Sequence, residues 1–331
     1  MLNIPLPITN TPYYPTPNLD TRDDLVYLSP TVAAKNIKPP KITPEIKSMA
    51  EKIRELAVSL RDRLVAFIDK ISNRSGGVKT TTRIKGDTGI ASLENKISRE
   101  IQSEAQEALR KALKTGNIEV AFSRIYDIFG ARFLAKNQAE INKVFKALCS
   151  AIENGEFKPE YIFNYAGNGI QPYFTKEQML ELQALCREKG YEIKGTKPAL
   201  GISITEDGYT SAHVNGTIKV IKDGLKKPVP VPTEIQIRTE NIEEISNAMH
   251  IPYDVWNGKD ILSGLSAEKR KTLEPIVEEY KSISNRKLDF YKYQTAYIKY
   301  KMQGGMSPKP QDYGLPESVA FEKIIELKKQ L

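Results

Sequence analysis

Hydrophobic residues recur every three or four positions in several stretches of the chain, which is the spacing of one face of an α-helix. Over residues 44–73 this stripe includes Ile46, Ile53 and Leu64. Thr43, just before it, is suited to the N-cap position, so we expect a helix here. The same pattern predicts further helices over residues 93–115, 137–154, 176–189, 241–250, 266–302 and 317–331.

Other stretches alternate between hydrophobic and polar residues, or are compact hydrophobic runs, as is typical of β-strands. They predict strands over residues 78–84, 125–135, 201–205, 209–220 and 233–238. Residues 156–200 carry turn signals around a short predicted helix, and we interpret them as an insertion in the sheet. Because helices and strands follow one another in mixed order, we expect an α+β fold, a mixed β-sheet flanked by helices.

The chain divides into three expected parts. Residues 1–43 are rich in proline, asparagine and threonine and predict an extended arm. Residues 44–260 contain every predicted strand and are expected to form one domain. Residues 261–331 predict a C-terminal helical extension.

The 331 residues have the composition of an ordinary globular protein, 40% hydrophobic and 27% charged, and no hydrophobic run long enough to cross a bilayer. Cys149 and Cys186 lack CxxC spacing and fall in helical patterns, so we expect buried free thiols and a reducing, cytoplasmic setting. Two histidines, His213 and His250, are too few for a phosphohydrolase with several histidine ligands. The net charge of +8 favours polyanionic partners such as nucleotides or RNA, although many basic proteins bind neither.

Three cations and a hydroxyl lie around the loop between the first predicted strand and the second predicted helix. Arg83 and Lys85 share one face of the strand end, and Ser92 and Lys96 share a helix face. Free amides of the glycine-containing loop 86–89 can also bind phosphate. This combination is suited to a triphosphate. The alternative is a solvated strand end without a ligand.

Two acidic residues fall in predicted strands. Asp127 lies in a hydrophobic run, where a buried carboxylate is costly unless a cation pairs with it. In the last predicted strand, alternation places Glu234, Gln236 and Arg238 on one face. On adjacent strands, Asp127 and Glu234 would hold a Mg²⁺ ion completed by phosphate oxygens, and Glu234 would also serve as base for an attacking hydroxyl. The alternative is that each acid forms a structural ion pair with Arg132 or Arg238.

A further polar group surrounds the start of the predicted strand 209–220. Tyr209, Ser211 and His213 point the same way on a strand. Tyr209 follows a glycine that permits a tight turn, and its ring can offer a flat face to a purine. Each residue has an ordinary alternative, because a tyrosine in a strand usually packs and a single histidine is usually structural.

Taken in order, these groups resemble the RelA/SpoT synthetase family. The family pattern is an Arg-x-Lys strand end, a Ser-x-x-x-Lys helix, a Tyr-Asp-hydrophobic-x-Gly-x-Arg strand, an Asn-Gly-Tyr-x-Ser-x-His segment, a Glu-x-Gln-Ile-Arg-Thr strand and a helix ending in histidine before an aromatic residue. In this sequence the pattern is matched by residues 83–85, 92–96, 126–132, 207–213, 234–239 and 248–253. The match spans residues 80–255 and includes both histidines.

The resemblance implies a nucleotidyltransferase-like synthetase fold and a pyrophosphokinase that uses Mg²⁺. The enzyme would move the β,γ-pyrophosphate of ATP to the 3′-hydroxyl of GDP or GTP. Arg83, Lys85, Asp127 and Glu234 would be catalytic. The implied binding residues are Arg83, Lys85, Ser92 and Lys96 for ATP, Asp127 and Glu234 for the metal, Tyr209, His213 and Gln236 for the acceptor, and Arg132, Arg238 and His250 in support.

Three departures from the family pattern bear on the acceptor. The loop before Ser92 is longer than usual, and Asp207 replaces the common asparagine. The short basic loop of the family is rewritten within residues 156–200, where Lys194 and Lys197 are the expected substitutes for its acceptor contacts.

The resemblance leaves other functions open. The partner domains of the long family members have no counterpart in the sequence, so we expect a small stand-alone synthetase. Some small relatives are toxins that pyrophosphorylate tRNA ends or consume adenosine nucleotides, so a tRNA acceptor and a neutralising antitoxin are alternatives. A non-catalytic nucleotide or RNA binder is a third. The basic, tyrosine-rich stretch 287–301 is interpreted as a packing or homo-oligomer face, with an RNA surface as the alternative.

Overall fold

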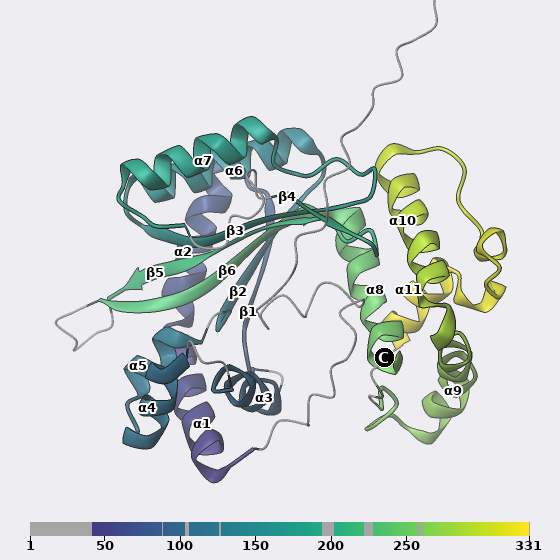
Figure 1. Ribbon diagram of the computed structural model, residues 1–331, viewed down its shortest axis with the longest axis horizontal. Helices are drawn as coiled ribbons and strands as arrows, with labels where there is room; N and C mark the ends of the chain where they lie inside the picture. The colour runs from purple at the N-terminus through teal and green to yellow at the C-terminus, as the bar shows by residue number, and fades with distance from the viewer. Residues whose placement is uncertain are drawn as a thin grey trace, which may run out of the picture.

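The computed structural model describes residues 42–87, 89–102, 106–125, 127–193, 202–221, 228–256, 258 and 260–330. Within them the chain forms a mixed sheet flanked by helices, so the predicted α+β fold is confirmed (Figure 1). The predicted arm, except for its last two residues, lies outside the described residues, as do Lys194 and Lys197. No helix in the described part of the chain is long and hydrophobic enough to span a membrane.

The sheet has six strands in the order β1-β2-β6-β5-β3-β4. The pairs β2·β6 and β3·β4 are parallel, and the other three pairs are antiparallel. This order places β2 beside β6, although the two strands are far apart in the sequence. The strands are β1 (Lys79–Ile84), β2 (Phe129–Ala135), β3 (Phe157–Gly167), β4 (Ile202–Thr205), β5 (Ser211–Val220) and β6 (Val229–Thr239).

All helices except α2 form three groups around the sheet. In Figure 1, α6 and α7 lie along the top of the sheet, α1 and α3 to α5 lie below it, and α8 to α11 stand to the right. The helices are α1 (Pro44–Ser59), α2 (Arg61–Arg74), α3 (Ala91–Glu100), α4 (Glu107–Thr115), α5 (Ile118–Arg124), α6 (Gln138–Glu153), α7 (Lys176–Glu188), α8 (Glu240–Trp256), α9 (Ala267–Ser282), α10 (Lys287–Gln303) and α11 (Phe321–Gln330).

The two faces of the sheet differ in chemistry because side chains alternate along each strand. On one face Ile84, Phe133 and Ile235 are buried in the main hydrophobic core, to which α2 and α6 contribute. The opposite face, called the polar face below, carries polar side chains in two neighbouring rows across β1, β2, β6 and β5. By register, one row consists of Arg83, Gly130, Glu234 and Asn215, and the next of Thr81, Arg132, Gln236 and His213.

Strand β3 corrects the prediction that residues 156–200 are an insertion in the sheet. Phe157–Gly167 is an inner strand between β5 and β4. Pro159 and a register irregularity after it interrupt the alternation. A proline within a run argues against a strand in a sequence pattern, which is why the strand was missed. The helix predicted in the same region is present as α7.

Three predicted helices are divided in the structure. The helix predicted over residues 266–302 contains α9 and α10 as separate helices, with Ile283 and a short 3-10 turn between them. The helix predicted over residues 44–73 breaks at Leu60 into α1 and α2, and no proline or glycine marks the break. The helix predicted over residues 93–115 contains α3 and α4 as separate helices. It ends as predicted at Gly116, which takes the left-handed conformation common at helix ends.

The helices α8 to α11 build a second hydrophobic core beside the sheet. The tyrosine-rich helix α10 contributes Phe290, Tyr293 and Tyr297, which are all buried. The ring of Tyr297 stacks on that of Phe321 in α11, with centroids 4.7 Å apart. This helix is therefore a packing face, the first of its two interpretations. Both cysteines of the chain are buried free thiols, as predicted.

Candidate active site

Asp127 lies in the turn that leads into β2, where two lysines hold it. Nζ of Lys85, at the end of β1, forms an ion pair with its carboxylate, and Nζ of Lys96 on α3 lies 3.8 Å away. Lys96 also pairs with the buried Glu100 at 2.6 Å. The prediction that Asp127 lies within a strand is wrong. Its φ of 63° is left-handed, which a strand does not allow, so β2 begins only at Phe129.

Glu234 lies on β6, in the middle of the polar face. Nδ1 of His213 is 3.2 Å from one carboxylate oxygen, and Nε2 of Gln236 donates to the other at 2.7 Å. A guanidinium nitrogen of Arg83 lies 3.9 Å from the same carboxylate. Only 14% of the Glu234 side chain is exposed, so these neighbours largely replace water around its charge.

Burial and these contacts act in opposite directions on the pKa of Glu234. Burial raises this pKa. The hydrogen bonds from His213 and Gln236 and the charge of Arg83 lower it by a larger amount, so the pKa of Glu234 lies below its ordinary value. Burial lowers the pKa of His213. At neutral pH we therefore assign an ionised Glu234 and a neutral His213, whose Nδ1 proton is donated to the carboxylate.

Two arginines of the polar face converge on Glu243 of α8. Arg132 lies 2.7 Å from one of its oxygens and Arg238 lies 3.0 Å from the other. Oε1 of Gln236 accepts hydrogen bonds from both guanidiniums, at 3.1 and 2.6 Å. Sequence reasoning missed Glu243, because an acid in the first turn of a helix is typical of a solvated residue that favours the helix dipole.

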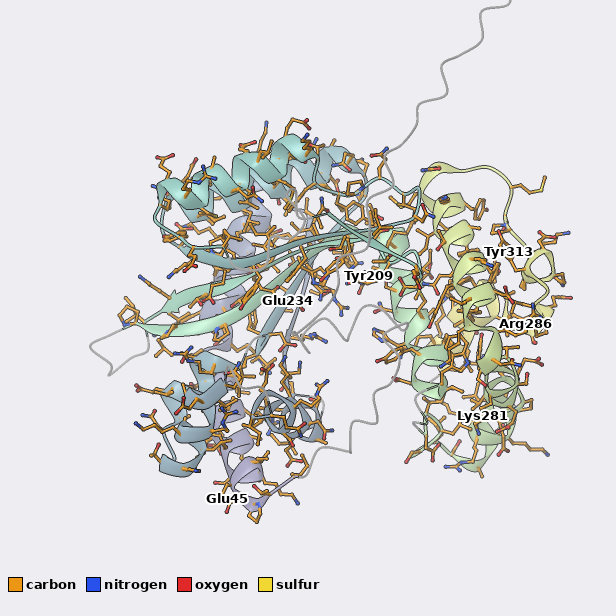
Figure 2. The ribbon with its side chains drawn as sticks, viewed as in Figure 1. Glu45, Tyr209, Glu234, Lys281, Arg286 and Tyr313 are labelled. Atoms are coloured by element: carbon orange, nitrogen blue, oxygen red, sulfur yellow. The ribbon has the colours of Figure 1, made fainter. Side chains whose placement is uncertain are left out.

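Tyr209 joins the same network through its hydroxyl, which lies 3.0 Å from Nε2 of His213 and 2.7 Å from Nη2 of Arg238. The ring of Tyr165 packs edge-on against its ring, with centroids 5.9 Å apart. Oδ1 of Asp207 accepts a hydrogen bond from the Tyr209 backbone N–H at 3.0 Å and so shapes the loop before β5. Figure 2 shows Tyr209 where the sheet meets the helices α8 to α11, and Glu234 further along the sheet.

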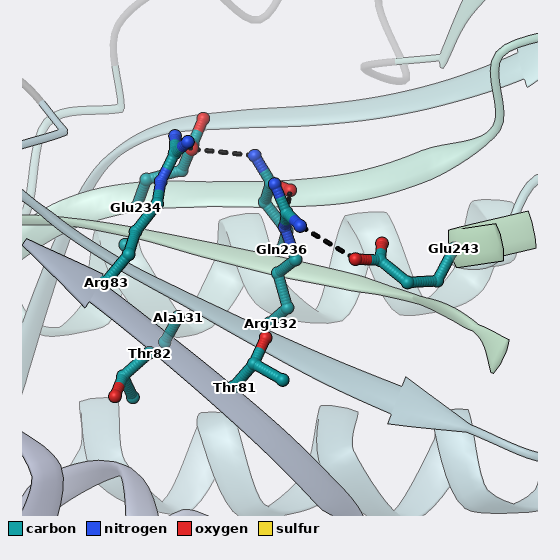
Figure 3. Close-up of a pocket in the computed structure, with 9 residues that line it drawn as sticks. Thr81, Thr82, Arg83, Ala131, Arg132, Glu234, Gln236 and Glu243 are labelled. Carbon is teal, nitrogen blue, oxygen red and sulfur yellow. Dashed lines mark hydrogen bonds and ion pairs between the residues drawn. The ribbon is translucent and has the colours of Figure 1, made fainter. Parts of the chain in front are cut away.

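A hollow of about 290 Å³ opens on the polar face over β1, β2 and β6 (Figure 3). At Gly130 a Cβ would lie 3.0 Å from Nε of Arg83, a tight contact that the arginine would have to relieve by shifting. The absence of a side chain therefore lets the arginine lie close over β2. The residues that line the hollow are Thr81, Thr82, Arg83, Gly130, Ala131, Arg132, Glu234, Gln236 and Glu243.

The contacts join most of the predicted site residues in two groups. Lys85, Lys96 and Asp127 form one group, and the other consists of Arg83, Glu234, His213, Tyr209, Arg238, Gln236 and Arg132. Ser92 is exposed at the start of α3, where its hydroxyl donates to the backbone oxygen of Gly89 at 3.1 Å. His250 is exposed on α8. Lys194 and Lys197 fall outside the part of the chain that the structure describes.

The two carboxylates predicted to bind Mg²⁺ have different surroundings. Oδ1 of Asp127 is buried and accepts no hydrogen bond within the described residues, since Nζ of Lys96 lies 3.8 Å from it, so a cation bound closer would satisfy it. Both oxygens of Glu234 already accept hydrogen bonds, from His213 and Gln236. Among the described residues no cluster of three or more acidic, histidine or cysteine side chains is arranged to hold a metal ion. A metal site shared by both acids therefore stays a prediction that needs phosphate oxygens as further ligands.

No protein-family model matches the chain, and no curated protein matches it. Solved structures that resemble it include small alarmone synthetase 2 from Bacillus subtilis, with 17% identity over 73% of this chain and 97% of that one and a TM-score of 0.35. A GTP pyrophosphokinase family protein from Streptococcus pneumoniae has 15% identity over 76% and 98%, with a TM-score of 0.36. Small alarmone synthetase 1 from Bacillus subtilis bound to its product pppGpp has 18% identity over 72% and 90%, with a TM-score of 0.29. By name, these proteins belong to the family that the sequence motifs resemble.

Proposed function

We propose that the chain is an ATP-dependent nucleotide pyrophosphokinase, which transfers the β,γ-pyrophosphate of ATP to the 3′-hydroxyl of GDP or GTP and so makes (p)ppGpp. The observation that carries the proposal is the position of Glu234. It borders the hollow lined by Arg83 and Arg132, and on its other side it binds His213, which in turn binds Tyr209. An ionised carboxylate between two polar regions is suited to a transfer from one ligand to another.

The hollow and the cations beside it form the proposed donor side. Guanidinium groups stack on bases and pair with phosphates, so Arg83 and Arg132 are suited to hold a nucleotide here. Lys85 and Lys96 lie next to Asp127, at the neighbouring end of β1. They would bind phosphate oxygens of the donor when Asp127 is paired with another cation.

Asp127 is the residue best suited to a Mg²⁺ ion, because its buried Oδ1 accepts no hydrogen bond within the described residues. Glu234 is the second proposed ligand, and oxygens of the transferred pyrophosphate would complete the coordination. A bound Mg²⁺ ion would supply neutralisation of the charge on the pyrophosphate.

On the acceptor side, the 3′-hydroxyl lies next to Glu234 and attacks the β-phosphorus of ATP. The new O3′–P bond forms while the bond from the β-phosphorus to the α,β-bridging oxygen breaks, AMP leaves, and Glu234 takes the hydroxyl proton. Because the pKa of Glu234 is lowered, its carboxylate is a weak base. Its main contribution is therefore to orient the hydroxyl, and the surrounding cations stabilise the charge that develops.

The 3′ end of a tRNA is a second candidate acceptor, favoured by a row of aromatic rings on β3. Tyr161 and Phe163 have ring centroids 6.2 Å apart, and Phe163 and Tyr165 have centroids 5.7 Å apart. The row meets the acceptor side at Tyr165, whose ring lies 5.2 Å from that of His213. Because one base covers about one ring, such a row favours a ligand with several bases.

Incubation with γ-labelled ATP and separate acceptors tests the proposal. Label on GDP or GTP supports it, whereas label only on deacylated tRNA favours the second candidate. Glu234→Gln should abolish the transfer and leave the circular dichroism spectrum unchanged. Glu244→Gln, at an exposed position on α8, is the matched control and should keep full activity. Failure of the wild type to consume ATP with any acceptor and Mg²⁺ would leave a non-catalytic nucleotide or RNA binder.

A further inference from the structure

Asn215 occupies a place on the polar face that none of the sequence motifs includes. It lies on β5, directly opposite Glu234 of β6 on one side and Tyr161 of β3 on the other. Directly paired residues on antiparallel strands project to the same face, with Cβ atoms about 5 Å apart. The Asn215 amide is therefore a close neighbour of the Glu234 carboxylate.

The hydrogen bonding of Asn215 is incomplete. Its Oδ1 is buried and accepts no hydrogen bond within the described residues. Most buried polar side-chain atoms have a partner, and leaving one without a partner destabilises the folded state. A valine or isoleucine would fill this strand position without that cost. An unsatisfied amide beside a catalytic carboxylate therefore points to a partner that the substrate supplies.

The position of Asn215 identifies which substrate this is. The hollow of the donor side opens over β1, β2 and β6, whereas Asn215 lies across Glu234 from it, on β5. His213, which holds Glu234, is two residues away on the same strand. A hydroxyl bound to Glu234 belongs to the acceptor ribose, and its nearest hydroxyl neighbour is on the adjacent 2′ carbon. A side chain one strand away from Glu234 is placed to bind that neighbour.

We propose that Asn215 binds the 2′-hydroxyl of the acceptor ribose while Glu234 binds the 3′-hydroxyl, an assignment that rests on the function proposed above. Rotation about χ2, which is soft in asparagine, turns the amide toward the hydroxyl. The amide can donate or accept a hydrogen bond, and a hydroxyl can do both. The acceptor class is therefore ribonucleotides, as free nucleotides or as an RNA 3′ end, and a 2′-deoxyribose is a poor acceptor.

The test compares kcat/KM for pyrophosphate transfer to GDP and to 2′-deoxy-GDP. The wild type should prefer GDP on the order of tenfold, because the deoxy compound leaves the buried Oδ1 of Asn215 without a partner. Asn215→Leu has a similar size but no hydrogen-bonding group, so it should lower kcat/KM for GDP toward the 2′-deoxy value and bring the ratio near one. Thr217→Val changes a half-buried residue two positions further along β5 and should keep the preference.

Different outcomes separate this assignment from the proposed function. Equal transfer to both nucleotides by the wild type, or a preference that survives Asn215→Leu, overturns the role of Asn215 and leaves the pyrophosphokinase standing. If neither nucleotide accepts pyrophosphate, the proposed function fails. The role of Asn215 is then tested by calorimetric measurement of the binding of GDP and 2′-deoxy-GDP. Equal dissociation constants for GDP and 2′-deoxy-GDP then overturn the assignment, and a GDP preference that Asn215→Leu abolishes supports it.

Discussion

Replacing Glu243 by alanine removes the acid that ties α8 to the sheet. Its two oxygens pair with Arg132 at 2.7 Å and with Arg238 at 3.0 Å, and these arginine side chains are 22% and 4% exposed. After the replacement both guanidinium charges remain on the polar face. Within the described residues, the side-chain hydrogen bonds left to Arg238 would be those to Gln236 and to the Tyr209 hydroxyl, which are both uncharged.

The free energy of unfolding should fall by about 3 kcal/mol in Glu243→Ala. Removing one partner of a buried ion pair costs about 3–5 kcal/mol, because the remaining charge is left without compensation in a poorly hydrated place. Water can reach Arg132 more easily than Arg238, so the lower end of this range applies. An unfolding entropy of about 2.1 cal/mol/K per residue over 331 residues corresponds to about 1.4 °C per kcal/mol, so the melting temperature should fall by roughly 4 °C.

Urea unfolding followed by circular dichroism measures this loss. Glu244→Ala is the matched control, because Glu244 is the next residue of α8 and is exposed, so its replacement should change the free energy by less than about 0.5 kcal/mol. The reasoning is refuted if Glu243→Ala loses no more than Glu244→Ala. The KM for the acceptor should also rise, because Arg238 binds the hydroxyl of Tyr209.

Three further predictions concern single groups of the site. Asp127→Asn should slow transfer by about 100-fold or more and weaken its Mg²⁺ dependence, and a Mg²⁺ titration unchanged from wild type would argue against metal binding there. Tyr209→Phe removes the hydroxyl shared by His213 and Arg238, so it should cost about 1 kcal/mol in urea unfolding and raise the acceptor KM; an unchanged stability would contradict the network. Burial raises the pKa of Asp207 to about 6, so the native state binds this proton more tightly than the unfolded chain, and wild-type stability is lost as pH rises toward that value. Asp207→Asn should therefore raise stability by only about 0.5 kcal/mol at pH 4 and by up to about 3 kcal/mol at pH 7, and an equal effect at both pH values would show that the carboxyl is not responsible.

The polar face of β6 could be predicted from the sequence, because hydrophobic and polar residues alternate along this strand and only one assignment of its two faces buries the hydrophobic residues. Ile235 and Ile237 are fully buried in the main core, so the residues between and beside them must face the other side. Glu234, Gln236 and Arg238 do so, and hydrogen bonds connect them there. The alternation within β6 is therefore enough to predict which of its side chains lie on the polar face, even when the neighbouring strands are not known.

Other parts of the site depend on contacts that no local pattern reveals. Arg132 and Glu243 are 111 residues apart in the sequence, and Glu243 alone is an ordinary acid near a helix start. The left-handed backbone of Asp127 has no local signal either, because the surrounding hydrophobic run favours a strand. Asn215 can be recognised as a site residue only from the strand order, which places it opposite Glu234.

The loop that carries Tyr209 depends on α10, although the sequence pattern assigns this helix to an extension beyond the synthetase motifs. Gln294 of α10 is fully buried and donates a hydrogen bond to the backbone oxygen of Asp207. Gly208 has a φ of 76° and packs so closely on α10 that a Cβ would lie 2.8 Å from Oγ1 of Thr295. The loop is thus fixed from behind by α10 while Tyr209 faces the acceptor side. A change on α10 that moves this loop should therefore alter acceptor binding without touching any residue that lines the donor hollow.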